Sequence, residues 1–165
     1  MADKKIIAVV GSTGAQGGGL CRAILADKKG EFACRAITRD PSKDKAKALA
    51  AQGAEVVKAD IDDLAGLKKA FAGAYGVYGV TNFWEHFSAE KEKAQAKNIA
   101  EAAKAAGVKH IIWSTLEDSR KLMKSDDKRM PILQQKYRVP HFDAKAEANE
   151  FFKGLPVTYL ITSFY

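Results

Sequence analysis

The sequence predicts an α/β fold in which about six parallel strands form a doubly wound sheet with helices on both faces. Three observations support this prediction. Short apolar runs rich in β-branched residues alternate with longer runs rich in alanine and lysine, the pattern of repeated strand–helix units. The run at residues 6–10 is continuously apolar, as expected for a strand covered on both faces. Gly53 and Gly107 directly follow alanine-rich runs, where helices often end in a left-handed residue.

The strands and helices can be placed in chain order. The predicted strands cover residues 5–10, 33–38, 55–58, 76–81, 110–114 and 157–162. The predicted helices between them cover residues 16–26, 44–52, 63–72, 88–106 and 142–153. By analogy with other doubly wound folds, the expected strand order is 3-2-1-4-5-6. The polar segment 116–140 is expected to form a surface loop beyond the carboxyl end of the fifth strand, the edge at which such sheets bind ligands.

Length and composition indicate one globular domain over residues 1–165. The chain is 47% hydrophobic and 28% charged, with no apolar run long enough to cross a bilayer, so we expect a soluble protein without a membrane partner. Its two cysteines form neither a metal-ligand spacing nor a disulfide framework, so no metal is expected. The net charge of +7 is spread over predicted helix faces, so no nucleic-acid partner is expected. No secretory leader is evident, and we expect a cytoplasmic location, with the nucleus as an alternative.

The most informative motif is the glycine-rich turn after the first predicted strand. In this context Gly11 permits a tight exit from the strand, Gly14 lets the backbone approach a phosphate, and Gly17 lets the helix pack closely. Exposed N–H groups and the helix dipole stabilise the charge of a pyrophosphate. The turn therefore predicts a dinucleotide-binding domain of the Rossmann type. The residues expected around the pyrophosphate are Gly11, Ser12, Thr13, Gly14, Ala15, Gln16 and Gly17.

The residue that follows the second predicted strand selects the nucleotide in such domains. An acidic residue there would accept a hydrogen bond from the 2′-hydroxyl of NAD, but this sequence has Arg39. A guanidinium holds a 2′-phosphate by two charge-assisted hydrogen bonds, so the expected cofactor is NADP(H). Lys43 adds positive charge to the same pocket, and Asp40 leaves NAD as an alternative.

Three aspartates follow the third predicted strand. Asp60 comes first and is placed to meet the edge of the adenine. Capping of the next helix is an alternative role for all three, because Asp62 and Asp63 directly precede the helical run. We assign the adenine contact to Asp60 and the capping to Asp62 and Asp63.

Four segments together resemble the NmrA-like family of atypical short-chain dehydrogenases, and most of all its animal NADP(H)-sensor members. They are residues 13–18, 38–41, 80–85 and 141–145, and the resemblance covers nearly the whole chain. It implies cofactor contacts beyond the glycine turn, from Arg39, Lys43, Asp60, Ile61, Thr81, Asn82, Lys97, Lys145 and, more weakly, Tyr165.

The same resemblance implies two alternative functions. One is a redox-sensing regulator that binds NADP(H) without turnover and acts through a protein partner. The other is an NADPH-dependent reductase of a quinone, an enone or another small carbonyl substrate. Relatives continue beyond the sixth strand into a segment that closes the substrate pocket, and this segment is expected to be absent here. A homodimer is left open.

A catalytic pair is the weakest part of the pattern. Short-chain dehydrogenases place tyrosine and lysine four residues apart on one helix, where the lysine holds the nicotinamide ribose and lowers the pKa of the phenol. Here His141 and Lys145 have that spacing, although Pro140 leaves open whether His141 lies inside the helix. Tyr137 cannot replace the missing tyrosine because Pro140 intervenes. Ser114 is a candidate substrate-binding hydroxyl or simply satisfies the strand end.

Overall fold

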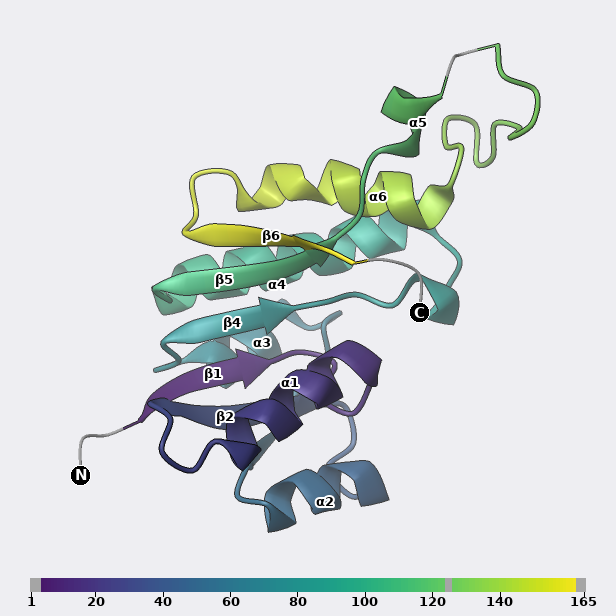
Figure 1. Ribbon diagram of the computed structural model, residues 1–165. Helices are drawn as coiled ribbons and strands as arrows, with labels where there is room; N and C mark the ends of the chain where they lie inside the picture. The colour runs from purple at the N-terminus through teal and green to yellow at the C-terminus, as the bar shows by residue number, and fades with distance from the viewer. Residues whose placement is uncertain (1–3, 124–125, 163–165) are drawn as a thin grey trace.

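The computed structural model describes residues 4–123 and 126–162. These residues fold into a parallel sheet flanked by helices (Figure 1). Its strands are β1 (Lys5–Val9), β2 (Phe32–Thr38), β3 (Glu55–Lys58), β4 (Gly76–Gly79), β5 (His110–Thr115) and β6 (Val157–Ile161). The strands pair in the order β3-β2-β1-β4-β5-β6, and every pair is parallel. This confirms the predicted fold class and strand order.

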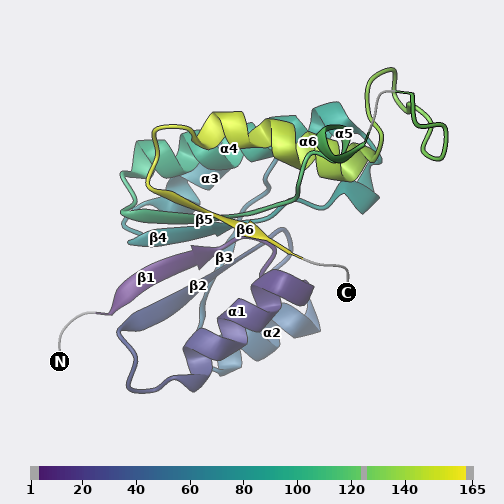
Figure 2. The same ribbon diagram turned by 45° about the horizontal axis from the view of Figure 1, so that its top comes forward.

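Helices cover both faces of the sheet, as Figure 2 shows. On one face lie α1 (Ala15–Ala26) and α2 (Asp44–Ala51). On the other lie α3 (Leu64–Phe71), α4 (Ala89–Ala106) and α6 (Pro140–Ala148). Shorter elements are η1 (Phe83–Glu85), α5 (Ser119–Leu122) and η2 (Asn149–Phe152). Gly107 ends α4 with a φ of 63°, the left-handed cap that the sequence predicts.

Each face of the sheet has its own apolar layer. Under α3, α4 and α6, the rings of Trp113 and Phe152 stack with centroids 4.7 Å apart, and both side chains are fully buried. Under α1, Val9 and Cys21 pack with Tyr78. Burial of a large apolar side chain contributes about 1.5–3 kcal/mol, so these two layers stabilise the packing of the helices on the sheet.

The strand at the sheet edge departs from the expectation of burial on both faces. In β6, Tyr159, Leu160 and Ile161 remain 40%, 41% and 57% exposed. The reason is positional, because within the described part of the chain β6 pairs only with β5.

In its described residues, 116–123 and 126–139, the segment between β5 and α6 has more regular structure than the uniform loop that we predict. It contains α5, an isolated bridge between Leu133 and Tyr137, and the almost fully buried ring of Tyr137. The buried carboxylate of Asp143 accepts hydrogen bonds from the backbone N–H groups of Ser119 and Arg138, both at 2.8 Å. These bonds fasten both ends of the segment to α6.

The last predicted helix also needs a correction. It begins at Pro140 rather than at residue 142, because the fixed φ of proline suits the first helical position, and His141 therefore lies inside α6. It ends at Ala148 and is continued by η2. No helix in the described part of the chain combines the length and apolarity needed to cross a bilayer.

Candidate functional site

The glycine turn lies at the carboxyl edge of the sheet, and its glycines pack closely on the backbone. Gly11 has a φ of +64°, a conformation that favours glycine. A Cβ on Gly17 would lie 2.5 Å from the carbonyl oxygen of Gly11, and one on Gly14 would lie 3.2 Å from the same oxygen. A side chain at position 17 would therefore clash with the backbone of the turn, whereas one at position 14 would require the Gly11 carbonyl to shift by a few tenths of an ångström.

The first turn of α1 presents backbone rather than side chains. Its N-cap, Gly14, makes no side-chain capping bond, and the first turn holds no acidic residue. Gly14 and Ala15 are exposed. The side chain of Ser12 adds no hydrogen-bond donor to this surface, because its buried hydroxyl donates to the carbonyl oxygen of Ile37 at 2.7 Å. Backbone amides at the positive end of a helix dipole form a binding site for an anion.

The side-chain oxygen of Gln16 is engaged by two hydroxyl groups of the protein. Its Oε1 accepts hydrogen bonds from the hydroxyls of Tyr78 at 2.5 Å and Ser114 at 2.7 Å. Ser114 is only 1% exposed. The geometry therefore favours the alternative in which the Ser114 hydroxyl satisfies the strand end rather than binding a substrate.

Arg39 lies just after β2 and is paired across the edge with Glu85 of η1. Its Nη1 donates to Oε2 of Glu85 at 2.9 Å, and its Nη2 donates to Oε1 at 2.8 Å. Both side chains remain in contact with solvent, at 62% and 42% exposure. The hydrogen bond with Glu85 and its negative charge raise the pKa of Arg39 further. The partner was not foreseen from the sequence, because the two residues are 46 positions apart.

The three aspartates of the loop after β3 do not all have the roles that the sequence predicts. Asp60 is exposed, and its Oδ1 accepts the N–H of Asp62 at 2.9 Å. Asp63 takes the N-cap position of α3 as predicted, but its side chain makes no capping hydrogen bond. The capping assignment is wrong for Asp62, which pairs with Gln95 and Lys91 instead. A second helix supplies these partners, which local sequence cannot reveal.

Other predicted cofactor residues are brought near this edge to different degrees. Lys43 is exposed at the N-cap position of α2, and Asn82 is exposed after β4. Ile61 is half-buried, and its carbonyl accepts a hydrogen bond from Asn98. Lys97 pairs with Glu101 at 3.8 Å, one turn further along α4 and so away from the edge. Tyr165 lies outside the described residues.

Lys145 of α6 lies in a buried cluster with Thr81, which follows β4, and Glu92. Its Nζ donates to the carbonyl oxygen of Thr81 at 3.1 Å and to Oγ1 of Thr81 at 2.7 Å, and it lies 2.9 Å from Oε1 of Glu92. The hydroxyl of Thr81 in turn donates to Glu92 at 2.6 Å. Burial lowers the pKa of Lys145, and the charge of Glu92 opposes that shift.

Glu92 is a residue that the sequence analysis missed. It is fully buried on α4 and lies between Lys145 and His86, whose Nε2 is 3.4 Å from its Oε2. A signal was present, because Glu92 shares the face of Ala89 and Ala96, three residues before it and four residues after it. A carboxylate on the apolar face of a helix indicates a buried cationic partner.

His141 is packed among aromatic rings rather than placed beside a donor or acceptor. Its ring centroid lies 4.8 Å from that of Trp84 and 5.7 Å from that of Phe83. Burial lowers the pKa of His141, and the nearby charge of Lys145 lowers it further. The neutral imidazole therefore predominates at neutral pH, which makes it a poor proton donor.

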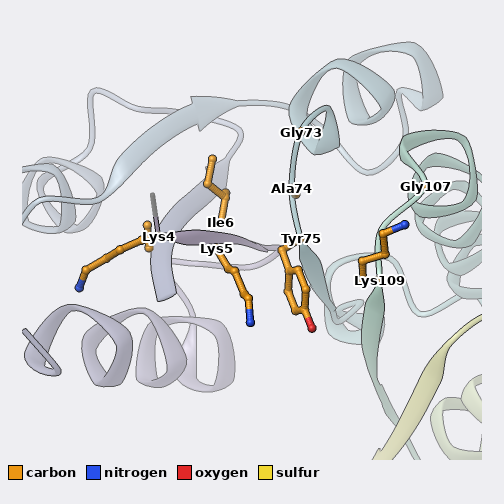
Figure 3. A pocket seen from close by; sticks show the side chains of 9 residues that line it. Lys4, Lys5, Ile6, Gly73, Ala74, Tyr75, Gly107 and Lys109 are labelled. Carbon is orange, nitrogen blue, oxygen red and sulfur yellow. The ribbon is translucent and has the colours of Figure 1, made fainter. Parts of the chain in front are cut away.

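A separate hollow of about 770 Å³ lies at the opposite edge, near the amino ends of β1, β4 and β5 (Figure 3). Lys5 and Tyr75 lie beside each other there, with Nζ 4.9 Å from the ring centroid, and Lys5 is paired with Glu31. This hollow is separated from the glycine turn by the length of the strands. Among residues 4–123 and 126–162, no group of three or more His, Cys, Asp and Glu side chains is arranged to hold a metal ion.

Comparison with known proteins identifies the family. The sequence profile of the NmrA-like family matches residues 3–165. The chain belongs to the NmrA-like family. It is 34% identical over 160 residues to the NmrA-like family domain-containing oxidoreductase FrzB of Cladobotryum sp, covering 94% of this chain and 47% of that protein. It is 38% identical over 116 residues to the oxidoreductase malD of Malbranchea aurantiaca, covering 68% and 34%.

Solved structures share the fold of this chain. NmrA, a negative transcriptional regulator, superposes with a TM-score of 0.75 at 27% identity, over 94% of this NmrA-like chain and 44% of that chain. It has been solved with NAD and with NADP. A triphenylmethane reductase of Citrobacter sp. complexed with NADP(H) gives a TM-score of 0.68 at 26% identity, over 98% and 50%. The NmrA-like chain described here spans about half the length of these relatives, or less.

Proposed function

We propose that this NmrA-like chain is a single nucleotide-binding domain that binds NADP(H) and acts as a redox-sensing regulator through a protein partner. The pyrophosphate lies on the turn from Gly11 to Gly17, and the 2′-phosphate lies against Arg39, with Lys43 nearby. The glycine contacts and the uncapped first turn of α1 fit a diphosphate. Relatives of the same fold bound to NADP(H) or NAD support this assignment.

The engagement of Lys145 is the observation that favours regulation over turnover. A lysine ammonium has three donors. Those of Lys145 face three acceptors, the carbonyl and hydroxyl oxygens of Thr81 and the carboxylate of Glu92. While this cluster is intact, no donor is left for a nicotinamide ribose or a substrate oxygen.

The rest of the expected catalytic pair points the same way. The position of the tyrosine is taken by His141, whose pKa is lowered by burial and then by the charge of Lys145. The His141 ring packs on Trp84 and contributes to the shape of the surface after β4. We infer that this surface, with the described residues of the segment between β5 and α6, is the part that a protein partner recognises.

An NADPH-dependent reductase of a quinone, an enone or another small carbonyl is the second candidate. It is favoured by the position of Lys145 four residues after His141 and by the lowered pKa of its ammonium, which makes it a stronger acid. The oxidoreductase relatives support it as well. When bound, the nicotinamide would supply the hydride, and Lys145 would have to leave the Thr81 cluster to reach it.

Thermal-shift titrations with NADPH, NADP⁺, NADH and NAD⁺ test both functions. We expect stabilisation by the phosphorylated pair, about 2.7 kcal/mol at a hundredfold excess over Kd, and no NADPH oxidation with quinones or enones. NADPH oxidation that Lys145→Met abolishes would support the reductase and contradict the regulator. No stabilisation by any dinucleotide would contradict both.

A further inference from the structure

We propose that Glu85 controls access to the phosphate site: it occupies the guanidinium of Arg39 until a 2′-phosphate displaces it, and that displacement moves the aromatic segment 83–87. The inference rests on the proposed function. It assigns to Glu85 the discrimination between phosphorylated and unphosphorylated nucleotides, and it links that discrimination to a change of surface.

The first step is competition for one pair of donors. Both terminal nitrogens of Arg39 point at the two carboxylate oxygens of Glu85, at 2.9 and 2.8 Å. A 2′-phosphate needs this planar fork for its own charge-assisted bonds. A phosphate placed beside Glu85 would also bring like charges together, because it carries about −1.5 to −2 at neutral pH. The two anions therefore exclude each other.

The Arg39–Glu85 pair connects two loops at the carboxyl edge of the sheet. Arg39 follows β2 and Glu85 belongs to η1 after β4, and β1 lies between these two strands in the sheet. The Arg39–Glu85 pair therefore joins the loops on either side of the strand that leads into the glycine turn. A nucleotide whose pyrophosphate lies on that turn has to place its adenosine between the same loops.

Only the phosphorylated nucleotide opens the Arg39–Glu85 pair. Solvent reaches both side chains, at 62% and 42% exposure, so this ion pair is weak and exchangeable. A dianion competes effectively for Arg39, whereas the neutral 2′-hydroxyl of NAD does not. NAD can then bind with the Arg39–Glu85 pair still closed.

The last step carries the change into the surface. Glu85 follows Trp84, which is 60% exposed and whose ring packs on His141 of α6. Phe87, two residues later, has a φ of 53°, an uncommon conformation for an aromatic residue. Its carbonyl accepts a hydrogen bond from Nε2 of Gln134 at 2.9 Å. Release of Glu85 therefore perturbs a segment in contact with both α6 and the segment between β5 and α6.

Calorimetry with adenosine 2′,5′-bisphosphate and adenosine 5′-monophosphate tests the competition without the nicotinamide. We expect Glu85→Gln to tighten the bisphosphate about three- to tenfold and to change the monophosphate by no more than about twofold. The matched control is Glu101→Gln, which removes an equally exposed carboxylate, 45% against 42%, from a surface pair on α4. This control should leave both affinities within about twofold.

The outcomes separate the inference from the function on which it rests. If the wild type binds the bisphosphate through Arg39 but Glu85→Gln leaves the affinity ratio of the two ligands unchanged, the role of Glu85 is wrong and the nucleotide site stands. If neither ligand binds to the wild type or to Glu85→Gln, the nucleotide site itself is wrong, and the role of Glu85 falls with it.

Acrylamide quenching of tryptophan fluorescence tests the movement of the segment. Trp84 is 60% exposed whereas Trp113 is fully buried, so the quenchable emission comes from Trp84. We expect saturating bisphosphate to change the quenching constant of the wild type, monophosphate to leave it unchanged, and Glu85→Gln to start near the bisphosphate-bound value. Equal quenching with and without bisphosphate would overturn the coupling to Trp84.

Discussion

Two ion pairs at the same edge of the sheet show how burial divides residues that look alike in the sequence. The Arg39–Glu85 pair is 62% and 42% exposed, whereas the Lys145–Glu92 pair is 10% and 0% exposed. A surface pair is worth about 0–1 kcal/mol, but breaking a buried pair costs about 3–5 kcal/mol. The first pair can therefore exchange partners with a ligand, and the second holds α4, α6 and the end of β4 together.

The largest effect is expected at the buried pair. Glu92→Gln leaves the ammonium of Lys145 buried beside a neutral amide, and it should lower the free energy of unfolding by about 3 kcal/mol in urea titrations. The double variant Glu92→Gln with Lys145→Met should recover part of the loss, because no buried charge is left unpaired. Glu101→Gln is the control and should change stability by less than about 0.5 kcal/mol. A loss at Glu92 as small as that of the control would remove the contrast between the pairs.

The exposed pair should show its effect in binding rather than in folding. Arg39→Ala removes charge-assisted hydrogen bonds worth about 1.5–3 kcal/mol and should weaken NADP(H) binding by about 10- to 150-fold, with little effect on NAD(H). Calorimetry with the four dinucleotides measures the difference. An equal loss for NADP(H) and NAD(H) would refute the contact with the 2′-phosphate.

A third cluster of charged side chains, around Glu147, is intermediate in exposure between the two pairs, and its effect on stability should depend on acid pH. Burial alone would raise the pKa of Glu147, whose side chain is 24% exposed, but hydrogen bonds from Arg120, Lys93 and Lys136 lower it to about 2. Because the folded pKa is below the unfolded value of 4.5, the stabilisation is present above pH 4.5 and is lost as the pH falls towards 2. Glu147→Gln should cost about 2 kcal/mol at pH 7 and progressively less in that window.

Urea titrations of the wild type and Glu147→Gln between pH 2 and pH 7 measure this difference. A constant gap across the range would show that Glu147 acts through packing rather than charge.

The smallest effect is expected at His141. Its pKa is lowered from 6.5 by burial and then by Lys145, so the unfolded chain binds more protons than the folded one just below pH 6.5. Stability should therefore fall as the pH falls through 6.5, and His141→Gln should flatten this slope. Thermal unfolding between pH 5 and pH 8 measures the slope, and an unchanged slope in the variant would assign it to another group.

Local signals predicted much of the fold. The alternation of apolar and alanine-rich runs located all the strands, and Gly107 marked the end of α4. The glycine turn was recognised because its spacing follows directly from steric rules, as the contacts of Gly11 and Gly17 show. Pro140 carried a helix-start signal, but this signal alone did not decide that His141 lies inside α6.

What the sequence by itself determined is therefore the strands, the longer helices and the backbone shape of the turn, because these depend on residues close together in the chain. The short elements η1 and α5 and the start of α6 were not predicted. Which charged side chains meet was decided only by the tertiary structure. Arg39 and Glu85 are 46 residues apart, and Lys145 and Glu92 are further apart still. The strand order brings the loops that carry Arg39 and Glu85 to one edge, and the packing of α6 on α4 brings Lys145 to Glu92. Burial then determines which pair can exchange with solvent, since the cost of removing a charge from water depends on everything packed around it.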